Sequence, residues 1–398
     1  MTDSIYRLRH RDILCFCVLS LLCLGVLMVH SATMRAVGDG HWHWSADGTK
    51  QLVFAAMAMG VFLLVGRMDY RELNRPATAW FGHPISWAVL AATLCCVLVL
   101  VPHVGVQING ARRWLKIGPI QIQPSELAKW AVVLFLAYVL ANRPVDLDRF
   151  FKGLLPVLLP VGLLCLMVVI QDFGTAALIA LCALTMLVAG RVKLWHLAIV
   201  VPPAVLAGLW FVHHEPYRWR RMTAFLDPYA APDKEGYHMI QSLLSFSTGG
   251  VLGKGLGNGI QKLGYLPEDT TDFIFAVICE ELGLFGALFT AAMYLGIIFV
   301  AWQSVKQHTD NFARLLVFGV TSMLSLQAVI NMAVATVSVP TKGLSLPLVS
   351  AGGTGLIITA AALGLMYSVT RMDGEESAEL SESMSLPTDR LSPLRAAA

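Results

Sequence analysis

Residues 273–302 read FIFAVICEELGLFGALFTAAMYLGIIFVAW, and Glu280 and Glu281 are the only charged residues in this run. About 20 apolar residues in a helix are enough to cross the roughly 30 Å hydrocarbon core of a bilayer. The run therefore predicts a membrane span, and it is long enough to exceed one simple span. Similar apolar runs predict ten spans in all, near residues 12–33, 51–66, 83–104, 125–142, 153–170, 175–190, 197–212, 273–302, 314–335 and 353–370.

The composition of the whole chain agrees with this class of protein. Of its 398 residues, 56% are hydrophobic and only 14% are charged, whereas globular domains carry about 25% charged residues. We expect an all-α polytopic membrane protein. The net charge of +3 includes no basic block, which argues against a nucleic-acid partner. All eight cysteines fall in apolar runs, so neither a disulfide framework nor a zinc site is indicated.

The distribution of Lys and Arg predicts how the spans are oriented. With the N-terminus inside, every short inner loop carries at least two basic residues, as the positive-inside rule requires. We expect a cytoplasmic N-terminus at 1–11, a membrane domain at 12–370, and a disordered cytoplasmic tail at 371–398 that is rich in Ser and Glu. A large extracytoplasmic loop, 213–272, then separates the seventh and eighth spans, and its apolar content favours an ordered structure.

Four polar segments interrupt the apolar pattern and open on the same outer face in this topology. Irregular backbone at membrane depth is tolerated only where protein or water covers it, so these segments predict a cavity at that face. Two of them also carry more basic residues than the positive-inside rule predicts for outer loops. The four segments are 109–129, 171–175, the 213–272 loop and 339–353.

The first polar segment combines cations with the start of a helix. Arg112, Arg113 and Lys116 flank a tryptophan, a pattern that fits either an interfacial anchor belt or a site for phosphate, which guanidinium groups bind with two hydrogen bonds. Glu126 and Lys129 are three residues apart on one predicted helix face and are expected to form an ion pair.

Two further segments have alternative interpretations. The stretch GGVLGKGLGNGIQK at 249–262 lacks the GxxxxGK[ST] pattern of a P-loop, but its backbone amides could cradle a phosphate. A flexible, tightly turning loop is the other reading of this stretch. Asp172, at the outer end of a span, is expected to cap the helix that follows it.

Acidic residues gather where the run at 273–302 begins. Asp272 is followed directly by Phe-Ile-Phe, so burial there is expected to raise the pKa of its carboxyl group unless a cation opposes it. A carboxylate with a pKa near neutrality suits general-base catalysis. Glu280 and Glu281 lie about two turns deeper and need partners. We interpret them as mainly structural, with Lys129 as a candidate partner.

Three motifs in this chain resemble those of the SEDS family, the shape, elongation, division and sporulation proteins. The motifs are NGARRWLKIGPIQIQPSELAK (109–129), LPEDTTDFIFAVICEELG (266–283) and VPTKGLSLPLVSAGG (339–353), and the resemblance extends over about residues 8–372. The order of the segments, the ten spans and the large outer loop also match the family. The segment PTKGLSLP, with Lys342, is more similar to the division branch than to the elongation branch.

The resemblance implies a peptidoglycan glycosyltransferase of the bacterial cytoplasmic membrane that polymerises lipid II, a disaccharide-pentapeptide on undecaprenyl pyrophosphate. It implies a class B penicillin-binding protein, a transpeptidase, as partner, together with other division proteins. The family's catalytic aspartate falls on Asp272. A divalent cation, Mg²⁺ or Mn²⁺, could contribute to the reaction, held either by Asp272 or by the pyrophosphate. The candidate substrate-binding residues are Arg112, Arg113, Lys116, Glu126, Lys129, Gln261, Lys262, Thr341 and Lys342.

The chain departs from the common family pattern close to the expected site. Thr270 stands where the family commonly has His, Gly259 where it has Ser, Gln171 where it often has Pro, and Ala351 where it has Tyr. Two other functions stay open at this stage: a flippase that moves the same lipid across the bilayer, and a non-catalytic scaffold that recruits the transpeptidase. Clustering of the polar residues at the outer face, rather than at mid-membrane, favours the enzyme over the flippase.

Overall fold

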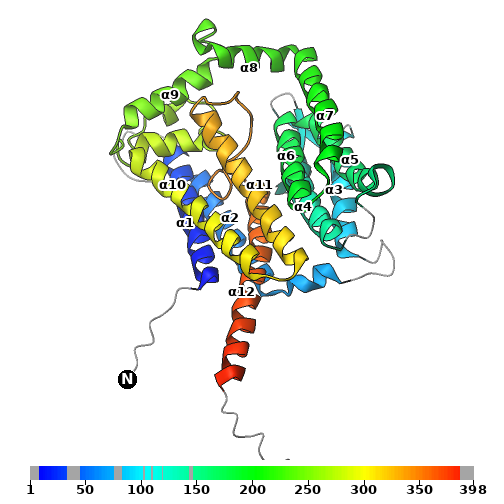
Figure 1. Ribbon diagram of the computed structural model, residues 1–398. Coiled ribbons are helices and arrows are strands. Elements are labelled where there is room, and N and C mark those ends of the chain that lie inside the picture. The colour runs from blue at the N-terminus through cyan, green and yellow to red at the C-terminus, as the bar shows by residue number, and fades with distance from the viewer. Residues whose placement is uncertain are drawn as a thin grey trace, which may run out of the picture.

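The computed structural model describes residues 9–33, 45–75, 83–101, 104–108, 111–118, 120–142 and 147–385, which form a helical bundle (Figure 1). Within these described residues, eight helices are long and apolar enough to cross a membrane, and two shorter apolar helices, α3 and α6, accompany them. Each overlaps one of the ten predicted runs, which confirms the polytopic all-α class. The bounds are α1 His10–Thr33, α2 Ala46–Arg67, α3 Pro84–Leu100, α4 Pro124–Asn142, α5 Leu155–Gln171, α6 Phe173–Ala189, α7 Leu194–His214, α10 Ile274–Gln307, α11 Asn311–Ala335 and α12 Thr354–Ser385.

Several helices begin at side chains that cap their free backbone amides. The Oγ of Ser45 accepts from the N–H of Gly48 at the start of α2, at 2.9 Å. Asp172 caps α6 as predicted: the Thr175 N–H donates to Oδ1 at 3.2 Å, and the Thr175 hydroxyl donates to Oδ2 at 3.0 Å. An unpaired amide at a helix start is costly when buried, so these caps fix where the spans begin.

Helix α10 bends near its start. Gly283 has φ 63° and ψ −153°, values that interrupt the helical backbone. A Cβ atom at this position would lie 2.4 Å from the backbone nitrogen of Gly253, so only glycine fits here. The bend separates a short buried segment, which carries Glu280 and Glu281, from the longer remainder of the helix. The run therefore exceeds one simple span, as its length predicted.

The loop at 213–272 is ordered, as its apolar content predicted. It contains α8 (Pro216–Leu226), a 3₁₀ turn at Pro228–Ala230, α9 (Tyr237–Gly249) and a second 3₁₀ turn at Gln261–Leu263. Helix α8 crosses one end of the bundle between α7 and α9, while the described N-terminal residues and the end of α12 lie at the opposite end (Figure 1). The end that carries α8 is called the capped end below.

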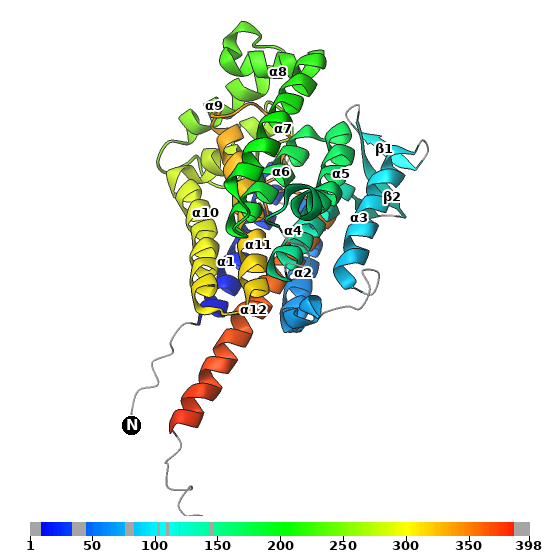
Figure 2. The same ribbon diagram turned by 45° about the vertical axis from the view of Figure 1, so that its right-hand side comes forward.

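A small antiparallel sheet replaces the irregular backbone expected before α4. Its strands are β1 (Gly105–Ile108), β2 (Ala111–Ile117) and β3 (Ile120–Ile122), in the order β1-β2-β3. Side chains alternate along β2: Leu115 is buried, while Arg112 and Lys116 are exposed. Figure 2 shows this sheet beside α3, towards the capped end. The alternation of apolar and basic residues has the period of a half-buried strand.

The tail differs from the prediction of disorder at 371–398. Helix α12 continues to Ser385, well past the last apolar residues of the span. Extending an existing helix needs no new nucleus, and the Ala, Glu, Leu and Met of this segment have high helix propensity. The described part of the tail is thus helical, whereas residues 386–398 and the first eight residues of the predicted N-terminus lie outside the described residues.

Burial is uneven across the bundle. In α4 72% of the most apolar window is buried against neighbouring helices, whereas in α7 the figure is only 17%. Helices α4, α6, α10, α11 and α12 pack against one another and around α1 and α2. Helix α7 stands away from this core and is joined to it mainly through α8. The space between α7 and the pair α5 and α6 is the cavity described next.

Candidate active site

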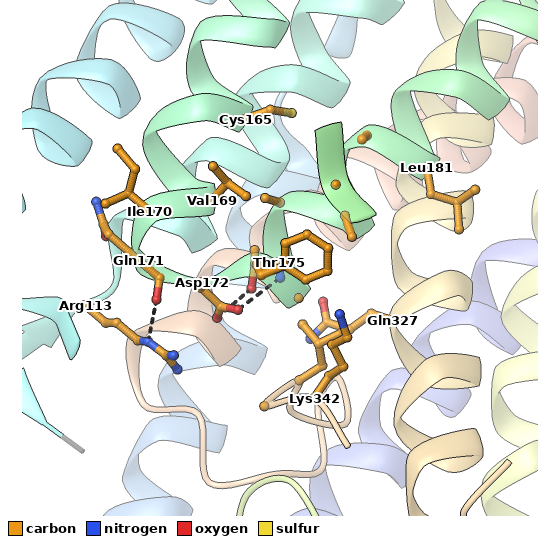
Figure 3. A pocket seen from close by; sticks show the side chains of 18 of the residues that line it. Arg113, Cys165, Val169, Ile170, Gln171, Asp172, Thr175, Leu181, Gln327 and Lys342 are labelled. Carbon is orange, nitrogen blue, oxygen red and sulfur yellow. Dashed lines mark hydrogen bonds between the residues drawn. The ribbon is translucent and has the colours of Figure 1, made fainter. Parts of the chain in front are cut away.

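A cavity of about 2200 Å³ runs between α5, α6 and α7 towards the capped end. Most of its length is apolar, lined by side chains such as Cys165, Val169 and Leu181. Its other end is polar and includes Arg113, Asp172 and Lys342, shown in Figure 3. A long apolar channel that ends in a charged chamber fits a ligand with a lipid tail and a polar head.

Asp272 lies in the charged chamber, in the turn that precedes α10. The turn is tied to the segment that follows α11. The Asn331 side-chain amide donates to the backbone oxygens of both Asp272 and Leu344, at 2.8 and 2.7 Å. The Ser350 hydroxyl donates to the Thr271 oxygen at 2.6 Å. Two segments distant in sequence thereby hold the aspartate backbone in place.

The carboxylate of Asp272 is left open to the cavity. No described residue forms a side-chain hydrogen bond or an ion pair with it. A Cβ atom on Gly343 would lie 3.2 Å from Asp272 Oδ2 and 4.0 Å from Arg113 Nη1, so Gly343 keeps the space between the two charges clear. This leaves the carboxylate available to a bound hydroxyl group.

Burial raises the pKa of Asp272 to about 7. Nearby Glu268 and Asp172 act in the same direction, since a second negative charge disfavours ionisation, while Arg221 and Arg113 oppose them. A carboxyl group that titrates near neutral pH accepts a proton more readily than an ordinary aspartate and is still ionised in a large fraction of molecules.

Five Lys and Arg side chains of the described residues line the large cavity, and four of them, all but Arg112, make contacts that hold them in place. Arg113 donates from Nε to the Gln171 backbone oxygen at 2.9 Å, which leaves its two terminal nitrogens facing inward. Lys342 lies 3.8 Å from the centre of the Phe173 ring. Burial lowers the pKa of Lys342 to about 8, against the attraction of Asp172. These side chains come from β2 and from the segment after α11.

The other two cations belong to α8. Arg218 lies over the Phe211 ring at 4.0 Å, and Arg221 lies over the Tyr217 ring at 4.7 Å. Both line the large cavity. Their positions, three residues apart on one helix, were not singled out in the sequence. The sequence feature that could have indicated them is the presence of six basic residues in 213–272, which the positive-inside rule does not explain for an outer loop.

The structure brings most of the predicted residues together. Arg112, Arg113, Glu126, Thr341 and Lys342 line the large cavity with Asp272. Two other predicted residues lie close by. Lys129 is fully buried behind the wall and binds Glu126 at 2.8 Å, the predicted ion pair, and Gln327 at 2.7 Å. Lys116 is exposed on β2 and does not line the cavity.

Gln261 and Lys262 differ from the expectation, because the structure places them away from the cavity. The Lys262 ammonium group is buried, 2.8 Å from Glu281 Oε1 and 3.2 Å from the Ser31 hydroxyl. Its charge is therefore used within the protein. Glu280 binds Lys254 at 3.1 Å, so Lys129 is not the partner of the glutamate pair.

The glycine-rich stretch does not cradle a phosphate. The amides of Gly257 and Gly259 donate to the Glu281 carboxylate, and the amides of Ile260 and Gln261 donate to that of Glu280. These bonds use the donors that an anion would need. The two buried glutamates, with the cations and amides around them, form a cluster of polar contacts that joins α10 to the loop. This agrees with the interpretation of Glu280 and Glu281 as structural.

The donor groups around Asp272 bear on the predicted divalent cation. In the part of the chain that the structure describes, no three His, Cys, Asp or Glu side chains come together as ligands for one ion. The carboxylates nearest Asp272 in the chamber are those of Asp172 and Glu268. The first caps α6, and the second accepts a hydrogen bond from Thr271 at 3.0 Å. The described carboxylates around Asp272 therefore do not form a three-ligand metal site.

Comparisons with known proteins agree with this geometry. The model of the FtsW/RodA/SpoVE family, described as a cell cycle protein, matches residues 11–375. The chain is 36% identical to a protein named probable peptidoglycan glycosyltransferase FtsW from Geobacter sulfurreducens, over 92% of this chain and 96% of that one. It is 38% identical to a protein of the same name from Nitrosococcus halophilus, over 88% and 89% of the two chains.

Two solved structures share the fold. One chain, from work described as the structural coordination of polymerization and crosslinking by a peptidoglycan synthase complex, has a TM-score of 0.68 at 30% identity and covers 90% of this chain and 97% of its own. The rod shape determining protein RodA of Thermus thermophilus has a TM-score of 0.63 at 27% identity, covering 90% and 95%. With the motifs, the ten apolar helices and the charged chamber, these matches establish that the chain belongs to the FtsW/RodA/SpoVE family, in which it is FtsW-like, and is a glycosyltransferase.

Proposed function

We propose that this chain polymerises lipid II into glycan strands, with Asp272 as the general base. The chain is a peptidoglycan glycosyltransferase of the division type, the activity that its FtsW relatives are named for. One observation carries the residue assignment. Asp272 has a pKa of about 7 and an open carboxylate, and it lies in a chamber of cations that continues into an apolar channel.

The reaction joins an acceptor sugar to a lipid-linked donor. Asp272 removes the proton from the acceptor hydroxyl, whose oxygen forms a bond to the anomeric carbon of the donor. The bond between that carbon and the pyrophosphate oxygen breaks, and its electron pair leaves with the lipid pyrophosphate. Arg113, Arg218, Arg221 and Lys342 are already in place around the chamber, so they stabilise this developing charge without reorganisation.

The apolar channel suits the polyprenyl tail of the donor. Its walls are α5, α6 and α7, and side chains such as Leu163, Leu184 and Val205 line it. Burying hydrocarbon stabilises binding by about 25 cal/mol for each Å² removed from water. A tail held there places the pyrophosphate at the charged end, next to Asp272.

We assign the capped end to the outer face of the bacterial cytoplasmic membrane, with both termini in the cytoplasm. Basic residues of the short loops at the other end support this orientation through the positive-inside rule. The basic residues of β2 and α8 are then explained by their place around the chamber. Residues 12–370 form the membrane domain, with 213–272 as its extracytoplasmic part. A class B penicillin-binding protein, a transpeptidase, is the proposed partner, because a similar solved chain belongs to a complex of polymerization and crosslinking; other division proteins complete the assembly.

Replacement of the base tests the proposal. Asp272→Asn keeps the shape of the side chain but cannot accept a proton, so we expect no polymer from purified lipid II. The assay contains the full chain with its transpeptidase and separates the glycan products on a gel. The same variant should elute as a single species and melt no lower than the wild type, because it removes a carboxylate that burial disfavours. Wild-type polymerisation by this variant would contradict the assignment of Asp272, whereas no polymer from the wild-type chain would favour the scaffold.

A further inference from the structure

A second cavity, of about 300 Å³, adjoins the charged chamber. Asp272, Arg221 and Lys342 line both cavities, whereas His238 and Phe273 line only the smaller one. A water molecule has a share of about 30 Å³ in the liquid, so the smaller cavity is large enough for several. The side chain of Asp272 therefore lines two adjoining cavities.

His238 is held at a fixed place in this smaller cavity. It is the second residue of α9 (Tyr237–Gly249), which packs against α10. Its ring stacks on that of Phe273, with the ring centres 5.9 Å apart and the planes 18° from parallel. Phe273 directly follows Asp272, so the stack also fixes the imidazole relative to the aspartate. Among the described residues that line the two cavities, His238 is the only histidine.

One nitrogen of this ring has no partner. His238 Nδ1 is buried and makes no hydrogen bond in the described part of the chain. A buried polar atom without a partner is unusual, because leaving it unbonded costs roughly 1–3 kcal/mol. Nε2 is not among the buried atoms without a partner. The ring thus has one nitrogen enclosed in the protein and one that is not.

Charged groups from several elements line the smaller cavity together with the ring. Arg221 comes from α8, Lys234 and Glu235 from the turn before α9, Glu268 from the turn before α10, and Lys342 from the segment after α11. Burial lowers the pKa of His238, Arg221 lowers it further, and Glu268 opposes them. The imidazole is therefore neutral at pH 7 and has a lone pair to accept a proton.

Proton removal from Asp272 needs a route when substrate is bound. Each sugar transfer leaves a proton on Asp272, which must leave before the next transfer. The donor and acceptor then occupy the large cavity and displace its water. The smaller cavity, which Asp272 also lines, is large enough for the water that takes up this proton.

We infer that His238 carries this proton away and so resets Asp272 between transfers. The inference rests on the proposed function. The O–H bond of the Asp272 carboxylic acid breaks, and its electron pair stays on the carboxylate. The proton passes through water in the smaller cavity to the lone pair of Nε2, the nitrogen that is not enclosed, where an N–H bond forms. The Nε2–H bond of the imidazolium then breaks, its electron pair returns to Nε2, and the proton passes to solvent. His238 is a relay residue that acts through Asp272.

Three variants of His238 test this role in the lipid II assay with the full chain and its transpeptidase. His238→Ala should lower kcat at least about tenfold, a loss within the range of general acid–base contributions, with little change in KM. Added imidazole should restore much of that rate to His238→Ala, because the vacated space admits the free ring. His238→Phe keeps the stack on Phe273 but should stay slow with or without imidazole. His238→Gln should also stay slow, because an amide does not carry a proton at neutral pH.

Controls separate this inference from the proposed function. His214→Ala, an exposed histidine at the end of α7 that lines neither cavity, should behave as the wild type. Asp272→Asn must be inactive in the same assay; if it is active, the proposed function fails. If Asp272→Asn is inactive while His238→Phe keeps the wild-type kcat, only the relay is overturned. It is also overturned if imidazole restores nothing to a His238→Ala protein that melts like the wild type.

Discussion

Burial and partners, rather than residue type, distinguish Asp272 from its acidic neighbours. Asp172 binds the Thr175 amide and hydroxyl and is committed to capping α6. Asp269 is also affected by burial, which raises its pKa to about 6, but it does not line the large cavity. Asp272 alone combines a pKa of about 7 with an open carboxylate at the junction of two cavities.

The pH dependence of the reaction follows from two titrating groups. Asp272 must be ionised to accept a proton, so kcat/KM should fall as the pH drops through about 7. Lys342 must be protonated to stabilise the pyrophosphate, so the rate should fall again above about 8. Initial rates across a pH series check this bell shape. Lys342→Arg should move the alkaline fall upward, because guanidinium does not titrate there; a flat profile would contradict both assignments.

The cations of α8 provide a matched pair of variants. Arg218 lines the chamber, whereas Arg220, two residues on, is exposed and pairs with Glu235 at 2.7 Å. Arg218→Met should lower kcat/KM about a hundredfold, as loss of one preorganised donor to a transition-state charge does. Arg220→Met should change it little, since exposed ion pairs contribute under about 1 kcal/mol. If kcat/KM fell equally in the two variants, Arg218 would have no specific role in stabilising the pyrophosphate.

At the scale of elements, the start of α10 is held by contacts with the loop that precedes it in the chain. Residues 253–261 wrap the two glutamates, and their backbone amides replace the water that the carboxylates lose. Lys262 and Lys254 supply the balancing charge. The same contacts position the turn that carries Asp272, because that turn lies between this loop and α10.

Loss of one buried cation should therefore act on stability. Lys262→Met leaves Glu281 charged, buried and without its ion-pair partner, which should cost about 3–5 kcal/mol of the free energy of unfolding. Thermal melting in detergent measures the loss. Adding Glu281→Gln to this variant should recover part of it, since the amide oxygen still accepts from the loop. Lys254→Met is the control, with a smaller cost expected because its ion pair is partly exposed. A raised KM with normal melting in Lys262→Met would instead support the substrate-binding role predicted from the sequence.

At the scale of the whole molecule, the function depends on a helix that does not pack closely. Helix α7 buries the smallest fraction of its apolar window among the eight candidate spans in the described residues. Its separation from α5 and α6 leaves the channel between them. Helix α8, joined to the end of α7, carries two of the chamber's cations. The position of α7 therefore sets both the width of the channel and the placement of those charges.

Filling this channel should affect substrates according to their tails. Ala204 of α7 lines the channel, whereas Leu206 is 65% exposed and does not. Ala204→Phe should raise KM for lipid II with the full polyprenyl chain by roughly tenfold, and less for an analogue with a short chain. Leu206→Phe should leave both KM values near those of the wild type. KM values that change equally for the two tail lengths would place the tail elsewhere.

The sequence by itself determined the ten spans, the ordered loop, Asp272 as the candidate base and the Glu126–Lys129 pair. These depend on properties of local stretches: apolar length, helical spacing, and the cost of a carboxylate where the apolar layer begins. Only the tertiary structure decided which distant groups meet. In the folded chain Lys262 forms an ion pair with Glu281, Arg218 and Arg221 line the chamber, and His238 stacks on Phe273. The physical reason is that the free energy of transferring an apolar run into a membrane is a sum over neighbouring residues. The partner of a charge, in contrast, is fixed by packing between segments that are far apart in the chain.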